Sequence, residues 1–318
     1  MPHGVKTSSD SPPMSLATRL KPAGSTGFGA DSTAEQVSEG LSLKGKTILV
    51  TGCTSGLGLE TCRVLSLRGA DVIGAGRSRP GAEMACSGLP KAGVGMGCDL
   101  SDPRSVRGCV ARIQSLGFRL DAIICNAGIL GTPTLHRTHG YELQFFTNHI
   151  GHFMLVLGLF DQLAPDARIV AVSSAYHRFA PREGIRFDNL SGRRGYNAWS
   201  AYGQSKLANI LFASEFQRRY GASGKTAYSV HPGLIPTNLA RRSSSGAKFF
   251  LRIIAPLFLK NVQQGAATQL FAAVHPDAVA LAGHYLADVN VAKPGRSAND
   301  PGLARRLWEF SEELVHEL

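Results

Sequence analysis

The stretch TILVTGCTSGLG at residues 47–58 decides the fold, because an apolar, β-rich run passes directly into a glycine-rich turn. Residues 47–52 have the composition of a buried parallel strand, and residues 59–67 continue with helical spacing. Glycines in such a turn permit a tight bend, close approach of the backbone to a pyrophosphate and close packing of helix on strand. The free N–H groups at the helix N-terminus would then face the phosphates.

The glycine spacing in this turn is G-x-x-x-G-x-G, which differs from the G-x-G-x-x-G of other dinucleotide folds. No Gly-Lys-Ser/Thr follows, so a nucleoside triphosphate loop is excluded. A plain glycine-rich connection between a strand and a helix is the structural alternative to a phosphate-binding loop.

Strands and helices alternate along the rest of the chain. We expect further strands at 71–75, 94–98, 120–125, 168–173 and 226–231, and helices at 103–115, 140–163 and 199–220. Asp102 caps the first of these helices, and the short segment 78–93 leaves room only for a reduced helix. The alternation predicts a single-domain α/β Rossmann fold, a doubly wound parallel sheet of about seven strands with helices on both faces.

The chain divides into an N-terminal extension, residues 1–43, and one nucleotide-binding domain, residues 44–318. The Ser, Pro and Gly content of the extension indicates a partly disordered arm, and a capping box at 32–36 with a stop at Gly40 predicts a short helix near 32–40. Within the domain we expect a substrate lid at about 234–262.

The segment 245–262 holds large apolar side chains between basic ones, which fits a lid or an interfacial membrane helix. A lid would lose hydrogen exchange when cofactor and substrate bind. Protection that requires lipid vesicles would favour the membrane helix.

Small or polar residues follow every expected strand. They are Gly52–Gly58, Gly76-Arg77, Asp99-Leu100, Asn126-Ala127-Gly128, Ser173-Ser174 and His231-Pro232-Gly233. Ligands of such sheets bind at the carboxyl ends of the strands, so these groups are expected to share one edge.

The helix expected at 199–220 carries a phenol and an ammonium one turn apart, Tyr202 and Lys206. Both would project from one face of the helix. A cation beside a phenol favours the phenolate and lowers its pKa from about 10, which makes the phenol a usable proton shuttle. A solvated helix face is the alternative.

With these motifs in place, residues 44–290 resemble the short-chain dehydrogenase/reductase family. The matching motifs are T-G-x-x-x-G-x-G at 51–58, N-A-G at 126–128, Asn148, Ser174, Y-x-x-x-K at 202–206 and P-G at 232–233. The segments FGADSTAEQVSEG at 28–40, TNHIGHF at 147–153, FDNL at 187–190 and YGQSKLAN at 202–209 are similar to its retinol-dehydrogenase-like branch, which includes WW-domain-containing oxidoreductases and chloroplast-import relatives.

The resemblance implies roles for four residues. Tyr202 would exchange a proton with the substrate, Lys206 would hold the nicotinamide ribose and lower the Tyr202 pKa, and Ser174 would bond the substrate oxygen. Asn148 would hold a water that relays protons to Lys206. The pattern favours Ser174 over its neighbour Ser173 for the catalytic role.

The same resemblance implies a set of residues around the nucleotide. They are Gly52, Thr54, Ser55, Gly56, Leu57, Gly58, Arg77, Asp99, Leu100, Asn126, Ala127, Gly128, Tyr202, Lys206, Pro232, Gly233, Ile235 and Thr237. The branch also carries a long insertion before Tyr202, whose aromatic side chains line a substrate mouth or pack as a surface loop. The candidates are Tyr176, His177, Phe179, Phe187, Tyr196 and Trp199.

Cofactor choice follows from the end of the second expected strand. Sites for NAD(H) place Asp or Glu there, on the ribose 2′-hydroxyl. Here Gly76 stands at that position, Arg77 follows it and Ser78 offers a further donor. A guanidinium grips a 2′-phosphate through charge-assisted hydrogen bonds, so we predict NADP(H). A surface arginine without this role is the alternative.

Composition limits the remaining partners. Lys and Arg number 34 and Asp and Glu 23, for a net charge of +11, but the excess is scattered and no nucleic-acid motif accompanies it. The six cysteines form no C-x-x-C pair, and His149 and His152 lack a further ligand at helical spacing, so we expect reduced thiols and no metal. No run of 18 apolar residues or secretion signal is present, which predicts a cytoplasmic protein with at most peripheral membrane contact.

Three functions remain open: an NADP(H)-dependent oxidoreductase that interconverts a carbonyl and an alcohol on an apolar small molecule, a catalytically silent nucleotide-binding regulatory protein, and a scaffold. The intact set Asn148, Ser174, Tyr202 and Lys206 favours the enzyme. A homodimer is the assembly to test. The sequence leaves open the substrate, the physiological direction and the role of the N-terminal arm.

Overall fold

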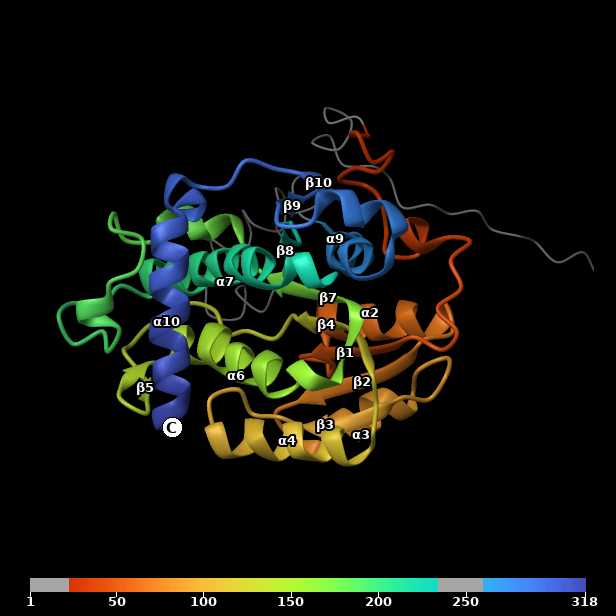
Figure 1. Cartoon of the computed structure of the whole chain (residues 1–318), viewed down its shortest axis with the longest axis horizontal. Coiled ribbons are helices and arrows are strands. Elements are labelled where there is room, and N and C mark those ends of the chain that lie inside the picture. The colour runs from red at the N-terminus through yellow and green to blue at the C-terminus, as the bar shows by residue number, and fades with distance from the viewer. Residues whose placement is uncertain (1–22, 234–259) are drawn as a thin grey trace, which may run out of the picture.

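A sheet of eight strands runs through the part of the protein that the computed structural model describes, residues 23–233 and 260–318 (Figure 1). Its order is β10-β9-β8-β7-β4-β1-β2-β3. The strands are β1 Thr47–Thr51, β2 Asp71–Gly76, β3 Val94–Gly97, β4 Leu120–Cys125, β7 Leu163–Val172, β8 Thr226–His231, β9 Tyr285–Ala287 and β10 Asn290–Val291. Every pair is parallel except β9 with the edge strand β10.

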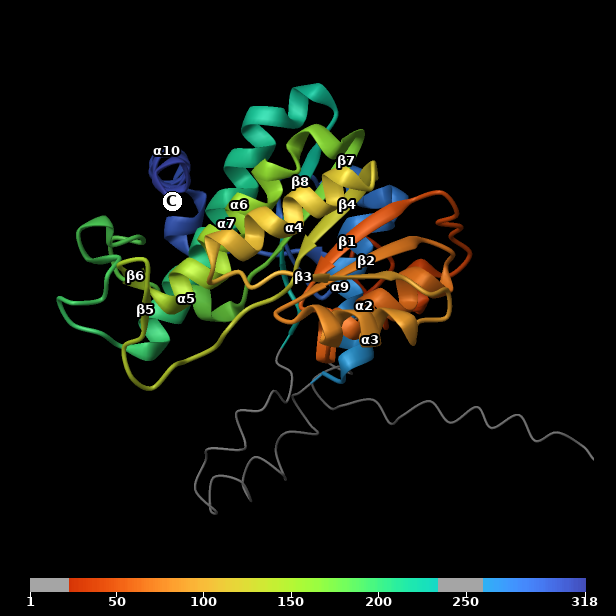
Figure 2. The ribbon, with the colours of Figure 1, turned by 90° about the horizontal axis from the view of Figure 1, so that it is seen from below.

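Helices cover both faces of this sheet (Figure 2). The longer ones are α2 Gly56–Leu67, α3 Arg79–Ser87, α4 Pro103–Ser115, α6 Gly151–Gly158, α7 Ala198–Tyr220, α9 Val262–Val274 and α10 Pro301–Glu317. Short elements complete the chain: η1 Gln36–Ser38, β5 Arg137–Thr138, β6 Tyr141–Glu142, α5 Leu143–Phe145, η2 Phe146–Ile150, η3 Phe160–Gln162, η4 Ala175–Phe179, η5 Phe187–Asn189, η6 Gly221–Ser223, η8 Pro276–Leu281 and η9 Arg296–Asn299.

Two hydrophobic cores lie on opposite faces of the sheet. Apolar side chains of α4, α6, α7 and α10 form one core, and those of α2, α3 and α9 form the other. All five residues of β1 are buried, as expected for a central strand covered on both sides. The predicted doubly wound Rossmann architecture is therefore confirmed, and the β4 and β8 bounds are those expected from the sequence.

The helix predicted at 140–163 is shorter than expected and is not regular. Residues 141–142 form β6, which pairs with β5 as a small antiparallel ribbon, and the helix begins at Leu143, where the Glu142 carboxylate accepts from the Phe145 N–H. A π-helical turn, η2, interrupts it before α6. Gly140, with φ of +86°, makes the turn between the ribbon strands, which explains why no helix begins there.

The fifth strand begins at Leu163, not at residue 168 as predicted. Leu163 pairs with Leu120, and a register shift separates this pair from the regular ladder that starts at Arg168. The extra residues thus form an irregular lead-in to β7, which a strand pattern in the sequence does not reveal.

The N-terminal segment 23–43 packs against the domain where the structure describes it. The predicted helix near 32–40 is a single 3₁₀ turn, η1, with Thr33 and Gln36 exchanging the capping-box hydrogen bonds. Ala34 and Val37 are buried in the core with α9. Division of the chain at residue 43 stays a prediction.

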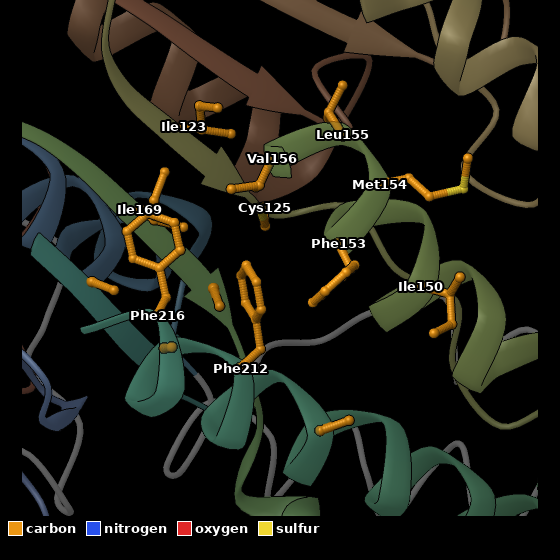
Figure 3. Packing of buried hydrophobic residues seen from close by; sticks show 14 of the residues in the cluster. Ile123, Cys125, Ile150, Phe153, Met154, Leu155, Val156, Ile169, Phe212 and Phe216 are labelled. Atoms are coloured by element: carbon orange, nitrogen blue, oxygen red, sulfur yellow. The ribbon is translucent and has the colours of Figure 1, made fainter. Parts of the chain in front are cut away.

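Aromatic rings fill the space between α6, α7 and α10. Figure 3 shows Phe153 of α6 beside Phe212 of α7, and their ring centroids are 5.7 Å apart. Trp308 of α10 stacks on Phe212 and meets Phe153 edge-on, with only 1% of its surface exposed. These contacts fix α10 on the outer side of α7.

Trp308→Ala is expected to lower the free energy of unfolding by about 3–5 kcal/mol, because it removes a large buried side chain and leaves a cavity. Chemical denaturation measures the change. The second tryptophan, Trp199, is 40% exposed, so Trp199→Ala should cost less than about 1 kcal/mol. Equal losses for the two variants would contradict the assigned packing of α10.

Candidate active site

The carboxyl ends of the parallel strands lie along one edge of the sheet, as the sequence predicted. The register places Thr51 of β1 beside Ala75 of β2, and Cys125 of β4 beside Ala171 of β7. The segments that follow these residues contain most of the predicted site. The edge therefore brings together groups that are far apart in the sequence.

The glycine-rich turn between β1 and α2 has no room for larger residues at its first and last glycine. Gly52 has φ of +72°, and a Cβ atom on Gly58 would overlap the carbonyl oxygen of Gly52. Ser55 precedes α2 in an extended conformation and makes no side-chain cap. The first turn of α2 thus keeps N–H groups for an anionic ligand, which fits the phosphates of a dinucleotide.

The loop after β4 is tied to the glycine-rich turn through Thr51. The Thr51 hydroxyl oxygen accepts from the N–H groups of Asn126 and Ala127, at 3.0 and 2.9 Å. The Asn126 amide donates in return to the Thr51 carbonyl at 2.8 Å. A Cβ atom on Gly128 would lie 3.3 Å from the Lys206 Nζ, so this glycine leaves the space that the lysine occupies.

Tyr202 and Lys206 lie on the first turns of α7, and the two serines after β7 have different partners. Ser173 donates to the Lys206 carbonyl at 2.8 Å and is buried among backbone groups. The Ser174 hydroxyl accepts from the Tyr176 N–H at 3.3 Å and acts to lower the pKa of the Tyr202 phenol. The two serines therefore have different partners, and the catalytic role of Ser174 stays a prediction.

The pKa of Tyr202 is opposite in direction to the expectation from the sequence. Burial raises the pKa of the phenol to about 12, although the hydrogen bond with Ser174 acts to lower it. The Lys206 Nζ donates to the Val172 carbonyl at 2.9 Å and lies 5.7 Å from the centre of the Tyr202 ring. Burial also lowers the pKa of Lys206 to about 8. Desolvation therefore outweighs the attraction between the cation and the phenolate.

Asn148 joins the loop after β4 to α7. Its side-chain oxygen accepts from the Ile129 N–H at 2.8 Å, and its amide donates to the Ile129 carbonyl and the Ser205 hydroxyl, both at 3.0 Å. Ser205 precedes Lys206 in α7. Asn148 thus positions two parts of the site; the water that the resemblance assigns to it stays a prediction.

Arg77 lies at the carboxyl end of β2, on the same edge of the sheet as the glycine-rich turn. The residue follows β2 directly, is exposed, and makes no ion pair with the residues that the structure describes. A Cβ atom on Gly76 would lie 3.0 Å from the Thr54 methyl group, so a carboxylate at Gly76 would crowd the loop. Ser78 caps α3, where its hydroxyl accepts from the Gly81 N–H.

The remaining predicted nucleotide residues lie at the same edge or outside the described ranges. The Asp99 carboxylate accepts hydrogen bonds from both the N–H and the hydroxyl of Ser101. A Cβ atom on Gly151 would overlap the Leu100 carbonyl, so α6 packs closely on this loop. Pro232 and Gly233 follow β8. Ile235, Thr237 and most of the predicted lid, 234–262, lie outside the described residues.

The aromatic side chains of the insertion separate into two groups. Tyr176 stacks on Trp199 at 5.3 Å, meets Phe179 at 5.3 Å and lies edge-on to Tyr202 at 5.9 Å. Phe179 is 62% exposed. These residues, Tyr176, Phe179 and Trp199, form an aromatic surface beside the phenol.

The other three aromatic candidates do not join this surface. His177 is held between the Ser174 carbonyl and the Gly295 N–H. Phe187 packs on Phe310, and the Tyr196 hydroxyl donates to the Thr132 carbonyl. Of the two alternatives for the insertion, packing describes these three residues, because tertiary partners on other elements engage them.

A cavity of about 310 Å³ lies next to the first turns of α7, lined in part by Arg186, Tyr196 and Gln204. Gln204 is two residues from Tyr202, so it projects from the other side of the helix. The cavity is therefore separated from the phenol by α7.

Two residues of the site network were not identified as such from the sequence. In the sequence Thr51 belongs to the glycine motif and His152 to a possible metal-binding pair, and neither pattern indicates the hydrogen bonds that the two residues make. His149 and His152 in fact bind separate partners, Ser311 for the first and Thr51 with Asn148 for the second. The T-N-H-I-G-H spacing was the available signal, because it places His152 one turn after Asn148.

All six cysteines are buried and free. Within residues 23–233 and 260–318, no helix has both the length and the apolar character needed to cross a bilayer.

Residues 46–248 match the family model described as short chain dehydrogenase. Short-chain dehydrogenase TIC 32 A, chloroplastic, of Brassica napus is 42% identical over 310 residues, covering 93% of this chain and 97% of that protein. Retinol dehydrogenase 14 of Homo sapiens is 37% identical, over 86% of this chain and 87% of its own. A solved blue fluorescent protein from a metagenomic library, in complex with NADPH, is 25% identical with a TM-score of 0.61, covering 77% of this chain and 96% of its own.

Proposed function

The chain belongs to the short-chain dehydrogenase family, and we propose that within it the protein is an NADP(H)-dependent enzyme that interconverts a carbonyl and an alcohol on an apolar small molecule. The observation that carries the proposal is the hydrogen-bonded set around α7. Ser174 acts on the pKa of the Tyr202 phenol, the buried Lys206 Nζ lies 5.7 Å from the centre of the Tyr202 ring, and the Asn148 amide donates to the neighbouring Ser205. The similarity to retinol dehydrogenases, expected from the sequence, is confirmed.

The fit to a nicotinamide dinucleotide rests on the glycine-rich turn. Gly52 and Gly58 let backbone groups approach closely, and the first turn of α2 offers N–H donors. When bound, the cofactor supplies the hydride chemistry. The chain's own task is to hold the substrate oxygen and to move a proton.

Proton transfer is assigned to Tyr202. In the reducing direction the phenol donates to the substrate oxygen while the Ser174 hydroxyl stabilises the charge that develops there. A raised pKa keeps the phenol protonated at neutral pH, which suits donation. Lys206 has donor hydrogens beyond the one used on Val172, and these would bond the ribose and stabilise the phenolate.

The aromatic surface beside the phenol supports a proposal for the substrate class. Tyr176, Phe179 and Trp199 present ring faces and edges rather than charges. Such a surface binds apolar groups and offers few hydrogen bonds. We therefore propose an apolar carbonyl or alcohol. A homodimer, peripheral membrane contact and a cytoplasmic location stay predictions.

A panel of apolar aldehydes, ketones and alcohols, followed through nicotinamide absorbance with each cofactor, tests the proposal. Turnover that depends on NADP(H) supports it. Tight nucleotide binding with no turnover across the panel would favour the catalytically silent nucleotide-binding protein instead.

The preference for NADP(H) over NAD(H) is expected to depend on Arg77. Removing one charge-assisted contact in Arg77→Ala should raise the NADP(H) KM by about 10- to 100-fold and leave the NAD(H) KM nearly unchanged. Arg79→Ala is the control, because that guanidinium pairs with Glu83 at 2.7 Å. Values of kcat/KM that are equal for the two cofactors, or higher for NAD(H), in the unmodified protein would refute the preference.

A further inference from the structure

A buried histidine connects the glycine-rich turn to the π-helical turn that carries Asn148. His152 is the second residue of α6 and is 3% exposed. Its Nδ1 lies 2.9 Å from the Asn148 carbonyl oxygen, and its Nε2 lies 2.8 Å from the Thr51 hydroxyl oxygen. One ring therefore touches two segments that the sequence separates by about a hundred residues.

The chemistry of the partners fixes the direction of both hydrogen bonds. A carbonyl oxygen only accepts, so Nδ1 of His152 carries the hydrogen and donates to Asn148. In the neutral ring Nε2 is then an acceptor, so the Thr51 hydroxyl donates to it. Burial lowers the pKa of His152 to about 4, which keeps the ring neutral at physiological pH.

The Thr51 hydroxyl is fully used in this arrangement. It donates to His152 and accepts from the N–H groups of Asn126 and Ala127. Its rotation is therefore fixed by three partners. Loss of the His152 ring leaves this hydroxyl only the Ile124 carbonyl as an acceptor, at the longer distance of 3.4 Å in a buried site.

The Asn148 carbonyl lies inside the irregular part of the helix. The π turn η2 spans Phe146–Ile150, with the Gly151 N–H bonded to the Phe146 carbonyl. A π turn replaces regular helical hydrogen bonds between residues four apart with bonds between residues five apart. The His152 side chain donates to the Asn148 carbonyl within this turn. The side chain of the same asparagine bonds Ile129 and Ser205.

We propose that His152 is a positioning residue that holds Asn148 and Thr51 in one fixed arrangement, so that the nucleotide loop and the proton-transferring helix keep their mutual geometry. The path runs from Thr51 through His152 and Asn148 to Ser205, the neighbour of Lys206. The activity readout of this inference rests on the proposed function, whereas its tautomer readout does not.

His149 provides a matched control in the same helix. It is also buried, 2% exposed, and burial lowers the pKa of its ring to about 3. Its Nε2 lies 2.9 Å from the Ser311 hydroxyl of α10 and not from the nucleotide loop. A role limited to core packing would make the two histidines equivalent.

The kinetic test compares His152→Phe, His152→Asn and His152→Gln with His149→Phe. For His152→Phe we expect kcat to fall about 10- to 100-fold, because small displacements of the reacting groups have effects of this size. The Kd for NADPH should rise no more than about tenfold, the effect of one neutral hydrogen bond. His149→Phe should lower the melting temperature while kcat and Kd stay within about twofold of the unmodified protein.

The two amide variants test the two ring nitrogens of His152 separately, because each amide can replace only one of them. The Asn amide can reach the position of Nδ1 and restore the donor to Asn148, while the longer Gln amide reaches toward Thr51. We expect His152→Asn to retain more kcat than His152→Gln, a comparison that holds even if His152→Phe does not fold. Equal kcat in these two variants, an unchanged kcat in His152→Phe, or an equal loss in His149→Phe would overturn the proposal.

The tautomer is measured without any substrate or cofactor. In protein labelled with ¹⁵N-histidine, NMR is expected to show His152 protonated at Nδ1 and not titrating between about pH 6 and 8. His152→Asn identifies the signal by its loss. A ring protonated at Nε2 would overturn the proposal even for an active enzyme, whereas the expected tautomer in a protein without turnover would leave it standing and refute only the proposed function.

Discussion

Tyr202→Phe is expected to lower kcat by about 10²- to 10⁴-fold, the usual contribution of a positioned general acid or base. The substitution removes the phenolic hydroxyl, whose pKa Ser174 acts to lower, and keeps the ring that packs edge-on against Tyr176. The fold and the shape of the site should therefore survive. Steady-state kinetics on a substrate identified from the panel, together with NADPH titration, measures both effects.

Tyr176→Phe is the control for this substitution, because it removes a phenolic hydroxyl from the neighbouring ring at 5.9 Å. Its kcat should stay within about threefold of the unmodified protein, since no proton transfer is assigned to it. Near-normal turnover in Tyr202→Phe would refute the mechanism. Loss of NADPH binding in the same variant would show that the phenol has a larger part in the nucleotide site than proposed.

Gly58→Ala is expected to weaken NADPH binding by about 10²-fold, because a displacement of the loop near 1 Å has consequences of this order. The added methyl group would overlap the Gly52 carbonyl, which is backbone and cannot rotate away. Loop and helix must therefore separate, and the N–H groups of α2 move away from the phosphates. Isothermal titration with NADPH measures the loss without requiring a substrate.

Gly108→Ala is the matched control for the glycine substitution. Gly108 lies in α4, and a Cβ atom there has no other atom within 4 Å. Alanine in an exposed helix should stabilise the protein by about 0.5–1 kcal/mol and leave the Kd unchanged. If Gly58→Ala bound NADPH as tightly as Gly108→Ala, the turn would not be the phosphate-binding loop.

The alternation of strands and helices, together with the glycine pattern after the first strand, was sufficient to predict the architecture. The bounds of β4 and β8 agree with the structure, and α7 begins one residue earlier than expected. These elements are predictable because their signals are local: hydrophobic runs for strands, caps for helices, and glycine where the backbone must approach closely. The shared edge of the strands then follows from parallel pairing alone.

The helix around Asn148 was not predictable in the same way. Its hydrophobic pattern is continuous, so the sequence indicated one regular helix. Only the three-dimensional structure shows the π turn, because its stability depends on partners from other segments, Thr51 through His152 and Ile129 through the Asn148 side chain. The local spacing could place His152 one turn after Asn148, but it carries no signal of Thr51, a partner about a hundred positions away.

The sequence by itself determined which chemical groups the site contains, and the tertiary structure decided their states and their partners. Spacing placed Tyr202 and Lys206 on one face of a helix, but burial decided that the phenol pKa rises, because desolvation penalises the charged form more than the distant ammonium favours it. The sequence of the insertion offers six aromatic candidates for a substrate mouth. Only packing left Tyr176, Phe179 and Trp199 beside the phenol, because the others found partners on distant elements, and burial and long-range contacts are properties of the whole fold.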